Sequence, residues 1–488
     1  MNRYFRMSGI GIAFGNSCAY VSVCRDGRSE TVANSAGERS TATVVAHQEG
    51  ELLTGTPAVQ MTVRQPANTV HSLKSLLACT LESVDTSSQA CKLEQHGEEI
   101  IVNFSNVTRK GVSALVKCVF ENLKETADSA LGEDKHDTVI SIPLTSSPEF
   151  RNTVKKCALS AGFNVLDLVP ESVAALLSLD STVVPDDGHT AVVRVGGSSM
   201  SITVIKTLSG MYSIVDHSEE KIGGNLFDRS IGEFLCGDFN RKNRCKVEEN
   251  ARSYSKVLKA SKGAKHNLST LNTAECNIES LFDGMDLISN LSRPRFETMI
   301  QNDLNKIKGA VQNMVTKHST ITMTRVVLTG GTCKVPKVQS TIGQLFPNST
   351  VVIQAPDEII SLGAATHAGM LSKFPSLSGK TELEANHTVG IPLTPSNIEV
   401  RVGDNVTQAV AKNTPLPYKT DIELPEGNVI VIEADGKCIA KAEVAGSDDK
   451  SKVSLHFEIL EDCSIEAIIK DSFTNERTSV HIPAPTGA

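Results

Sequence analysis

A strand–turn–strand pattern that occurs twice places the strongest constraint on how this chain folds. In the first copy, apolar and small residues alternate over residues 8–24, around the turn Gly15-Asn16-Ser17. In the second copy, residues 191–205 alternate around Gly196-Gly197-Ser198-Ser199, 181 residues further along. Such alternation is typical of two strands joined by a turn. A repeat at the scale of a whole domain indicates a duplicated α/β unit rather than a solenoid, whose period is shorter.

The rest of the chain divides at a change of composition after about residue 372. Before it, apolar residues at helical spacing predict helices at 112–123, 148–162, 225–240, 247–268 and 300–315. Residues 374–386 are polar with Pro and Gly, and beyond them only strand alternation remains, with Asp435-Gly436 as a hairpin turn. We therefore predict an α/β domain over 1–373, a linker over 374–386 and a small all-β domain over 387–488.

Composition excludes several classes of function. The 48 Lys and Arg against 56 Asp and Glu give a net charge of -8, which argues against direct nucleic-acid binding, because affinity for phosphate backbones depends on clustered cations. The sequence has no run of about 18 apolar residues, so no membrane helix is expected, and we expect no signal peptide. Twelve cysteines without a C-x-x-C pair are typical of a reducing cytosol. Met7 is an alternative to Met1 as the start.

Glycine turns follow predicted strands at four places, which are Gly15, Gly196-Gly197, Gly223-Gly224 and Gly330-Gly331. A glycine turn exposes backbone N–H groups and lets the main chain approach an anion closely. One such turn alone usually indicates only a hairpin, whereas four in one chain predict a cleft that binds phosphate. The chain has neither a P-loop nor the Rossmann glycine pattern, which argues against those two folds.

The order of these segments resembles the seventy-kilodalton heat-shock (DnaK-like) family. The matching segments are residues 10–23, 68–77, 139–143, 161–177, 192–205, 222–228, 264–270, 326–339 and 356–365, with 413–417 in the predicted β-domain. The resemblance covers the whole chain. Residues 249–284 and the short C-terminus look like the divergent ribosome-associated branch of the family, whose members pair with a J-domain protein related to zuotin.

The resemblance implies an α/β, actin-like ATPase domain of two lobes, built from duplicated ribonuclease-H-like units, with ATP between the lobes. It also implies a β-sandwich, here without a helical lid, that binds peptides in ordinary members. Lys74 matches the catalytic lysine of the family and Glu171 its metal-site glutamate. The implied nucleotide contacts are Gly15, Asn16, Ser17, Gly196, Gly197, Ser198 and Ser199 at the phosphates, Gly223 and Gly224 near the ribose and phosphates, and Lys265, Ser269, Gly330, Gly331, Lys334 and Asp357 at the adenosine.

Three aspartates of the family pattern are replaced in this chain, by Ala13, Arg194 and Ser201. Magnesium is held by carboxylates, waters and phosphates, and phosphoryl transfer needs a group that positions the attacking water. We therefore expect no metal site in the protein, a dispensable Mg²⁺, and a vestigial Lys74 and Glu171. ATP hydrolysis should be very weak or lost.

Arg194 has two interpretations. Strand alternation gives it the same facing toward Gly196 that Ala13 has toward Gly15. It is therefore predicted to point at the phosphates or at the vacated metal site, where a guanidinium binds phosphate oxygens bidentately. The alternative is an ion pair with a nearby carboxylate, such as Glu171, in a protein that binds no nucleotide.

Other departures affect the adenosine side and the coupling to the β-domain. The family's Glu and Arg at the adenosine become Lys262 and His266, and its Asn-Glu-Pro coupling segment becomes residues 170–172. The linker keeps only Leu383 between two glutamates where the family has a leucine run. We therefore expect peptide capture to be weak and insensitive to nucleotide.

These observations favour an atypical heat-shock-70-type chaperone or co-chaperone that binds ATP with little or no hydrolysis. It would act in the cytosol with a zuotin-like J-domain protein, at the ribosome mainly through that partner, during nascent-chain folding, and an ordinary heat-shock-70 chaperone is a further candidate partner. The first alternative is an ATP-hydrolysing, peptide-binding chaperone of the same family. The second is a sugar kinase or filament protein of the actin-like superfamily, which the predicted β-domain disfavours.

Overall fold

The computed structural model describes residues 8–77, 79–84, 86, 89–104, 108–132, 135–180, 188–208, 211–373, 394, 396–403, 405–410, 414, 418–425, 429–443, 453–459, 464–471 and 477–482. The chain forms two compact units. The larger comprises Met1–Thr182, His189–Ile205 and Val215–Glu382, and the smaller comprises Val183–Gly188, Lys206–Ile214 and Leu383–Ala488. Met7 and the predicted linker over 374–386 lie outside the described residues.

The larger unit contains two lobes, each with its own hydrophobic core. The first lobe is built on a sheet in the order β12-β11-β1-β2-β3, with β4 paired to β2. These strands are β1 (Ser8–Phe14), β2 (Cys18–Arg25), β3 (Arg28–Thr31), β4 (Ser40–Ala42), β11 (Asp137–Ile142) and β12 (Asn164–Pro170). Strand β1 runs parallel to β11 and antiparallel to β2, so the first predicted strand–turn–strand copy is confirmed.

Shorter strands and several helices complete the first lobe. The strands are β5 (Val45–Gln48), β6 (Glu51–Thr54), β7 (Thr69–Val70), β8 (Lys92–His96), β9 (Glu99–Phe104) and β10 (Thr108–Gly111). The helices are α1 (Gly55–Arg64), η1 (Pro66–Asn68), α2 (Leu73–Leu76), η2 (Leu81–Ser83), α3 (Val112–Leu131), α4 (Pro148–Ser160) and α5 (Glu171–Asp180). Helix α3 buries the residues that carry the predicted periodicity, among them Leu115, Val119 and Phe120.

The second lobe repeats the topology of the first, because its sheet has the order β15-β14-β13-β18-β19. The strands are β13 (Gly188–Val195), β14 (Met200–Leu208), β15 (Met211–Glu220), β18 (Met323–Thr329) and β19 (Thr350–Val352), with a separate hairpin of β16 (Thr273–Phe282) and β17 (Met285–Ser292). Strands β13 and β18 are parallel, as β1 and β11 are. The predicted duplication of an α/β unit is therefore confirmed at the level of topology.

The helices of the second lobe are α6 (Gly224–Asn243), η3 (Val247–Glu249), α7 (Ala251–Thr270), α8 (Arg293–Met299), α9 (Gln301–Lys317), η4 (Gly331–Lys334) and α10 (Pro336–Gly343). The helix predicted over 247–268 begins as the short η3 and continues as α7 only after Asn250, whose side chain accepts a hydrogen bond from the Ser253 amide. An asparagine in that position is a favoured helix N-cap, and this explains the later start.

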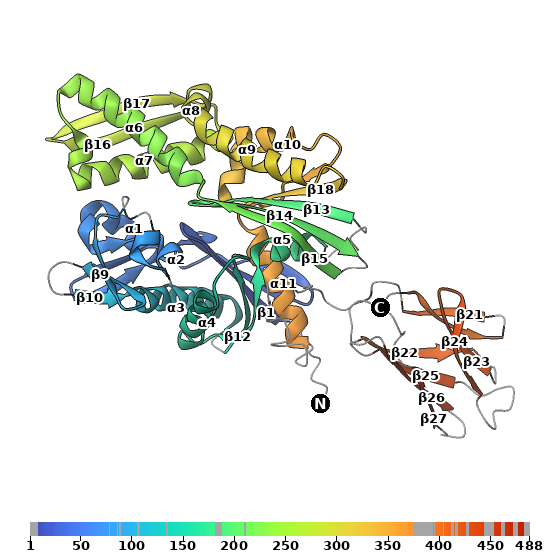
Figure 1. Ribbon diagram of the computed structural model, residues 1–488. Coiled ribbons are helices and arrows are strands. Elements are labelled where there is room, and N and C mark those ends of the chain that lie inside the picture. The colour runs from blue at the N-terminus through green and yellow to red at the C-terminus, as the bar shows by residue number, and fades with distance from the viewer. Residues whose placement is uncertain are drawn as a thin grey trace. The chain divides into compact units, whose positions relative to one another are not determined.

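Helix α11 (Ile359–Lys373) follows the second lobe in sequence but packs against β1 and α5 of the first (Figure 1). The contact is close because glycines line it. A β-carbon on Gly11 would overlap the backbone of Ala365, and one on Gly363 would overlap the carbonyl of Ala174. This packing positions the start of α5, where Glu171 lies.

In the C-terminal part of the smaller unit, the described residues from 394 onward form two four-stranded antiparallel sheets, in the orders β21-β20-β23-β24 and β22-β25-β26-β27. The strands are β20 (Ile398–Val402), β21 (Asn405–Val410), β22 (Tyr418–Leu424), β23 (Val429–Ala434), β24 (Lys437–Glu443), β25 (Val453–Ile459), β26 (Ile465–Asp471) and β27 (Arg477–Ile482). Alternate residues of β25, including Leu455 and Phe457, enter a common core. Asp435 and Gly436 both have positive φ and join β23 to β24, as a tight hairpin requires.

The predicted α/β fold with an all-β sandwich is confirmed. No helix among the described residues is long and apolar enough to cross a membrane.

Candidate functional site

The glycine turns of the two copies meet each other. The amide of Gly15 donates to the carbonyl of Cys18 at 3.1 Å, and the amide of Gly196 donates in the same way to Ser199 at 2.9 Å. Asn16 Nδ2 donates to Ser198 Oγ at 2.6 Å, and a β-carbon on Gly197 would overlap Ser17 Oγ. The two predicted phosphate-binding turns therefore lie together, and the absence of a side chain at Gly197 permits the approach.

The remaining glycine turns pack against the second of these. The amide of Gly224 donates to the carbonyl of Gly196 at 2.9 Å, and a β-carbon on Gly223 would lie 2.5 Å from the Gly197 carbonyl oxygen. Gly330 has a φ of +91° and its β-carbon would overlap the Val195 carbonyl, so both conformation and space favour glycine there. All four predicted turns thus belong to one site. Thr332, next to Gly331, adds a hydrogen bond from Oγ1 to the Gly196 carbonyl at 2.8 Å.

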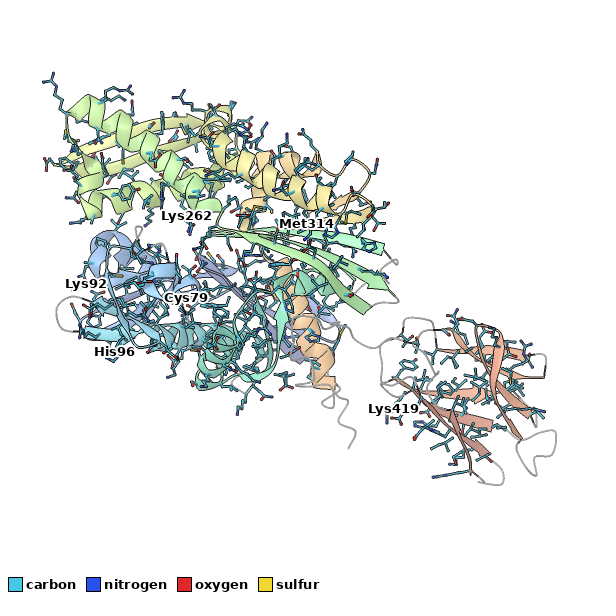
Figure 2. All side chains as sticks on the ribbon, viewed as in Figure 1. Cys79, Lys92, His96, Lys262, Met314 and Lys419 are labelled. Carbon is cyan, nitrogen blue, oxygen red and sulfur yellow. The ribbon has the colours of Figure 1, made fainter. Side chains whose placement is uncertain are left out.

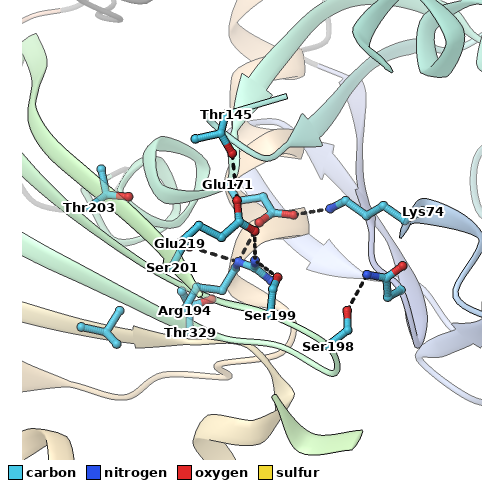
Figure 3. A network of polar contacts seen from close by, with 12 residues as sticks. Lys74, Thr145, Glu171, Arg194, Ser198, Ser199, Ser201, Thr203, Glu219 and Thr329 are labelled. Carbon is cyan, nitrogen blue, oxygen red and sulfur yellow. Dashed lines mark hydrogen bonds and ion pairs between the residues drawn. The ribbon is translucent and has the colours of Figure 1, made fainter. Parts of the chain in front are cut away.

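A buried cluster of charged side chains lies beside these turns (Figure 3). Lys74 Nζ, on α2, is 2.6 Å from Glu171 Oε1, and Arg194 Nε, on β13, is 2.8 Å from Glu171 Oε2. The exposed fraction of the side chain is 9% for Lys74, 14% for Arg194 and 10% for Glu171. Glu171 follows Pro170 at the end of β12 and is the first residue of α5, where the helix dipole favours an acid. One carboxylate therefore binds two cations.

Arg194 also contacts its own glycine turn. Its Nη2 donates to Ser199 Oγ at 2.9 Å, and its Nε donates to Ser201 Oγ at 3.3 Å. Strand alternation correctly places this side chain beside the turn. The ion pair with Glu171, which the alternative interpretation predicted, is present.

A second carboxylate completes the cluster. Glu219, on β15, has Oε1 3.7 Å from Arg194 Nη2, and its Oε2 accepts a hydrogen bond from Thr145 Oγ1 at 2.8 Å. Two cations and two carboxylates thus balance each other in the cluster. The balance arises from the protein's own side chains.

The pKa values reflect this arrangement. Burial raises the pKa of Glu171, but the neighbouring Arg194 and Lys74 outweigh burial and lower it to about 2. Burial lowers the pKa of Lys74, and although Glu171 opposes the change, Arg194 adds to it. Glu171 is therefore ionised at neutral pH and holds both cations.

These residues do not fit a divalent metal ion. Both oxygens of Glu171 are paired with cationic side chains, and positions 13 and 201 offer no carboxylate. Among the residues that the structure describes, no group of three or more His, Cys, Asp or Glu side chains has the arrangement of a metal site. Magnesium prefers several free oxygen ligands, whereas Glu171 has both oxygens paired with cations and Glu219 accepts a bond from Thr145 and lies 3.7 Å from Arg194.

A small cavity of about 10 Å³ adjoins the cluster, and its walls include Glu171, Ser172, Arg194 and His217. That volume suits about one water molecule. Ser172 Oγ and His217 Nε2 are buried without a hydrogen-bond partner. Because a buried polar atom without a partner is costly, one water in this cavity would stabilise both groups.

On the predicted adenosine side, Lys265 is buried and bound to Asp228. Its Nζ is 2.8 Å from the Asp228 carboxylate and donates to the Gly224 carbonyl at 3.0 Å. Burial lowers the pKa of Lys265 while Asp228 opposes the change. Lys262 (Figure 2) is close enough to lower the pKa of Lys265 further. Burial lowers the pKa of His266, and the nearby Lys265 and Lys262 lower it further. Ser269 Oγ, one helical turn further, donates to the Lys265 carbonyl at 3.0 Å.

Lys334 and Asp357 form an ion pair of 2.6 Å, and the hydroxyl of Tyr20 donates to the same Asp357 oxygen at 3.1 Å. Tyr20 lies on β2 of the first lobe, so Asp357 links this side of the site to the first copy. A β-carbon on Gly331 would lie 3.9 Å from that of Asp357. Every residue in the predicted set is thus connected to the glycine turns through a short series of contacts.

The sequence prediction did not include Asp228, Glu219, Thr145, Tyr20 and Thr332. Asp228 closes the segment 222–228 that carried the family resemblance, so the signal was present there. Glu219 is one of two consecutive acids at the end of a strand, a pattern typical of a solvated strand end. That pattern contains no indication that Glu219 binds Arg194.

Comparison with known proteins gives a consistent picture. The family model "Hsp70 protein" matches residues 9–424. Heat shock 70 kDa protein 14 of Danio rerio is 37% identical over 389 residues, which is 76% of each chain. The Homo sapiens protein of that name is 32% identical over 90% of this chain and 89% of its own, and heat shock 70 kDa protein 14-A of Xenopus laevis is 32% identical over 97% and 93%. The family match continues into the all-β unit, which argues against the sugar-kinase and filament alternative.

Proposed function

The chain belongs to the Hsp70 family of chaperones, and we propose that it binds ATP with little or no hydrolysis and acts as a scaffold for a J-domain partner at the ribosome. The observation that carries the nucleotide part of this proposal is the Arg194–Glu171–Lys74 cluster beside four glycine turns. In an Hsp70 ATPase domain, nucleotide is usually bound with Mg²⁺. Here a guanidinium supplies positive charge at the corresponding turn.

The turns offer the groups that phosphate oxygens require. Within the described residues, the backbone amides of Asn16, Ser17, Gly197 and Ser198 donate to no protein acceptor. Amides of this kind and a nearby guanidinium bind phosphate oxygens. Replacement of three family aspartates by Ala13, Arg194 and Ser201 makes the site more positive, which favours ATP without a metal.

The same cluster is unsuited to phosphoryl transfer. Hydrolysis needs a group that orients the attacking water and cations that neutralise the developing charge. Lys74 and Glu171, the two catalytic-type residues that remain, are bound to each other, and Glu171 is also bound to Arg194. We therefore expect Glu171 to be occupied as a counter-ion rather than available to a metal or to water.

Two measurements test the nucleotide proposal. Single-turnover assays with radiolabelled ATP, with Mg²⁺ and a J-domain protein present, should give a rate close to the protein-free control. Titration calorimetry should give similar ATP affinities in EDTA and in Mg²⁺. A rate stimulated many-fold, or binding that strictly requires Mg²⁺, would refute the proposal and support the hydrolysing chaperone instead.

The partner part of the proposal rests on the resemblance to the ribosome-associated branch and on charge. A net charge of -8 disfavours direct contact with ribosomal RNA, so a zuotin-like J-domain protein would supply most of the ribosome contact. We propose a cytosolic location on the same basis, and an ordinary Hsp70 chaperone as a further partner. Peptide capture by the β-unit should be weak and insensitive to ATP.

A pull-down of the full chain from cytosol, followed by a ribosome gradient, tests this part. A J-domain protein recovered in roughly equal amount and co-migrating with ribosomes would support the scaffold. Recovery of many unfolded clients that ATP releases would instead support the alternative, an ATP-hydrolysing, peptide-binding chaperone. Fluorescence anisotropy of a labelled peptide, with and without ATP, gives an independent check on that alternative.

A further inference from the structure

We propose that Arg194 forms an interlobe clasp that holds the two lobes of the larger unit closed in the absence of nucleotide. The clasp consists of Arg194, Glu171, Lys74, Glu219 and Thr145. This inference goes beyond the proposed function, because it concerns the protein before any nucleotide binds. A chain that did not bind ATP at all would still contain the clasp.

The members of the clasp come from opposite lobes. Lys74 and Glu171 belong to the first lobe, on α2 and α5, and Thr145 follows β11 of the same lobe. Arg194 and Glu219 belong to the second lobe, on β13 and β15. The 2.8 Å ion pair from Arg194 to Glu171 and the 2.8 Å hydrogen bond from Thr145 to Glu219 therefore both cross from one lobe to the other (Figure 3).

Solvent screens the central pair little. Arg194 and Glu171 are mostly removed from solvent, so their interaction is screened far less than that of a surface pair, and removing either partner would leave the other charge poorly solvated. Separation of the lobes would break this pair, leaving Lys74 with Glu171 in the first lobe and Arg194 with Glu219, at 3.7 Å, in the second. Each lobe would retain one cation and one carboxylate, so the clasp is able to open and close without leaving an unpaired charge.

Contacts outside the clasp join the same two lobes. Asn16 Nδ2 donates to Ser198 Oγ at 2.6 Å, and Lys221 Nζ donates to the Ser83 carbonyl at 3.1 Å. Helix α7 of the second lobe also lies against α1 and η1 of the first. All of these contacts are made between the protein's own atoms, and they join the same two lobes as the clasp does.

The clasp implies that nucleotide has little effect on the equilibrium between open and closed lobes. Because Arg194 already connects the Ser199 turn to Glu171, a nucleotide arriving at that turn meets lobes that are closed. A ligand shifts a conformational equilibrium only by its difference in affinity for the two states. If the closed state predominates beforehand, ATP has almost no population left to shift.

Double electron–electron resonance, which measures the distance between two spin labels, tests the clasp on the full chain. Suitable positions are Glu98, in the exposed turn between β8 and β9 of the first lobe, and Asp283, in the exposed turn between β16 and β17 of the second. Unnatural amino acids should carry the labels, since the chain has 12 cysteines. We expect one narrow distance distribution that is the same with and without saturating ATP. A broad distribution that narrows only when ATP is added would overturn the proposal.

Substitution of Arg194 tests the cause. Arg194→Met keeps the length of the side chain without its charge, and should broaden the nucleotide-free distribution and shift it to longer distances. Arg241→Met is the matched control, because Arg241 forms an exposed ion pair with Asp238 in the same lobe, and it should leave the distribution unchanged. A distribution for Arg194→Met as narrow as that of the wild type would overturn the clasp.

A milder variant covers the case in which Arg194→Met does not fold. Thr145 is exposed, so Thr145→Val should fold while losing the hydrogen bond to Glu219. We expect a smaller broadening in the same direction, and no broadening would contradict the role of Glu219 in the clasp. ATP affinity, measured separately by calorimetry, distinguishes a failure of the clasp from a failure of the proposed function.

Discussion

The turns at Gly15–Ser17 and Gly196–Ser199 occupy equivalent places in two sheets of the same topology, yet their surroundings differ in charge. Ala13 lies two residues before the first turn, beside Ser141 of the parallel strand β11. Arg194 lies two residues before the second, beside Thr329 of the parallel strand β18. The first position is apolar and the second carries a cation that is bound to Glu171.

This difference shows that two copies of one topology can keep the same architecture while carrying different charges beside their turns. The glycines that shape both turns remain, as do the hydrogen bonds that close them. What changes is the charge at the position before each turn, which is neutral in one copy and positive in the other. The same backbone turn can therefore have neutral or positive surroundings, and the side chains at these two positions set the difference.

The largest expected effect comes from reversing the charge at the second turn. Arg194→Asp would place a third carboxylate beside Glu171 and Glu219 and leave Lys74 as the only cation of the cluster. Removal of one partner from a buried ion pair typically costs about 3–5 kcal/mol, and reversal should cost at least that. We expect a large fall in the free energy of unfolding, measured by denaturant titration, and loss of ATP binding in EDTA.

The matched control is Arg241→Asp, which reverses the charge of an exposed arginine in the same lobe. It should change the free energy of unfolding by less than about 1 kcal/mol, since exposed pairs contribute little. If Arg194→Asp unfolds no more easily than this control, Arg194 and Glu171 do not form a buried pair in solution.

Local sequence patterns were sufficient for much of the fold. Alternation around Gly15 and Gly196 predicted β1, β2, β13 and β14, and the composition change near residue 372 separated the helical part from the all-β part. Boundaries were less accurate where a local cap intervened, as with Asn250 before α7. The successful strand predictions share a cause, because strand alternation is encoded within a few neighbouring residues.

The charged cluster was only partly predictable, because it joins residues far apart in the sequence. The family motif identified Lys74 and Glu171, and strand alternation placed Arg194 beside its turn. Neither source contained the bond from Thr145 to Glu219, 74 positions apart. Such a pairing depends on how the two lobes approach, which no local pattern records.

A second test of the difference between the two turns uses pH. Of the two turns, only the one at Gly196–Ser199 is linked to a carboxylate, because Arg194 binds both Ser199 and Glu171. The pKa of Glu171 is about 2 in the folded protein against an ordinary value of 4.5. Its contribution to stability is therefore complete above about pH 4.5 and is lost as pH falls toward 2. Between pH 5 and pH 3 this single group should remove about 2 kcal/mol from the free energy of unfolding.

Glu171→Gln should remove that part of the acid dependence. Unfolding curves of the wild type and the variant, measured at half-unit steps from pH 5 to pH 3, should converge as Glu171 becomes protonated in the unfolded chain while the folded protein still holds it as an ion. Two curves that stay parallel across the range would mean that Glu171 is not held as an ion by Arg194 and Lys74.

A third test compares the glycines themselves. A β-carbon on Gly15 would lie 2.5 Å from the Cys18 carbonyl oxygen, which is backbone and accepts the hydrogen bond of the turn. A β-carbon on Gly197 would meet Ser17 Oγ, the end of a side chain that is free to rotate. Gly15→Ala should therefore cost about 1–3 kcal/mol, and Gly197→Ala clearly less. Thermal unfolding of both variants checks the order, and a reversed order would contradict the geometry of the turns.

The smallest effect is expected at Asp357, which receives one bond from each copy. Lys334 belongs to the second copy, but its side chain is 51% exposed, so solvent screens its 2.6 Å ion pair. Lys334→Ala should change the free energy of unfolding by less than about 1 kcal/mol.

Tyr20 belongs to the first copy, and its hydroxyl donates to the same Asp357 oxygen from a mostly buried position. Tyr20→Phe should lower the free energy of unfolding more than Lys334→Ala does, because it leaves Asp357 without its buried donor while keeping the shape of the ring.

The same Lys334→Ala variant also tests nucleotide contact. Since the substitution scarcely affects folding, any loss of ATP affinity in that variant reports on nucleotide contact alone. A variant that folds normally and binds ATP as the wild type does would remove Lys334 from the predicted adenosine contacts.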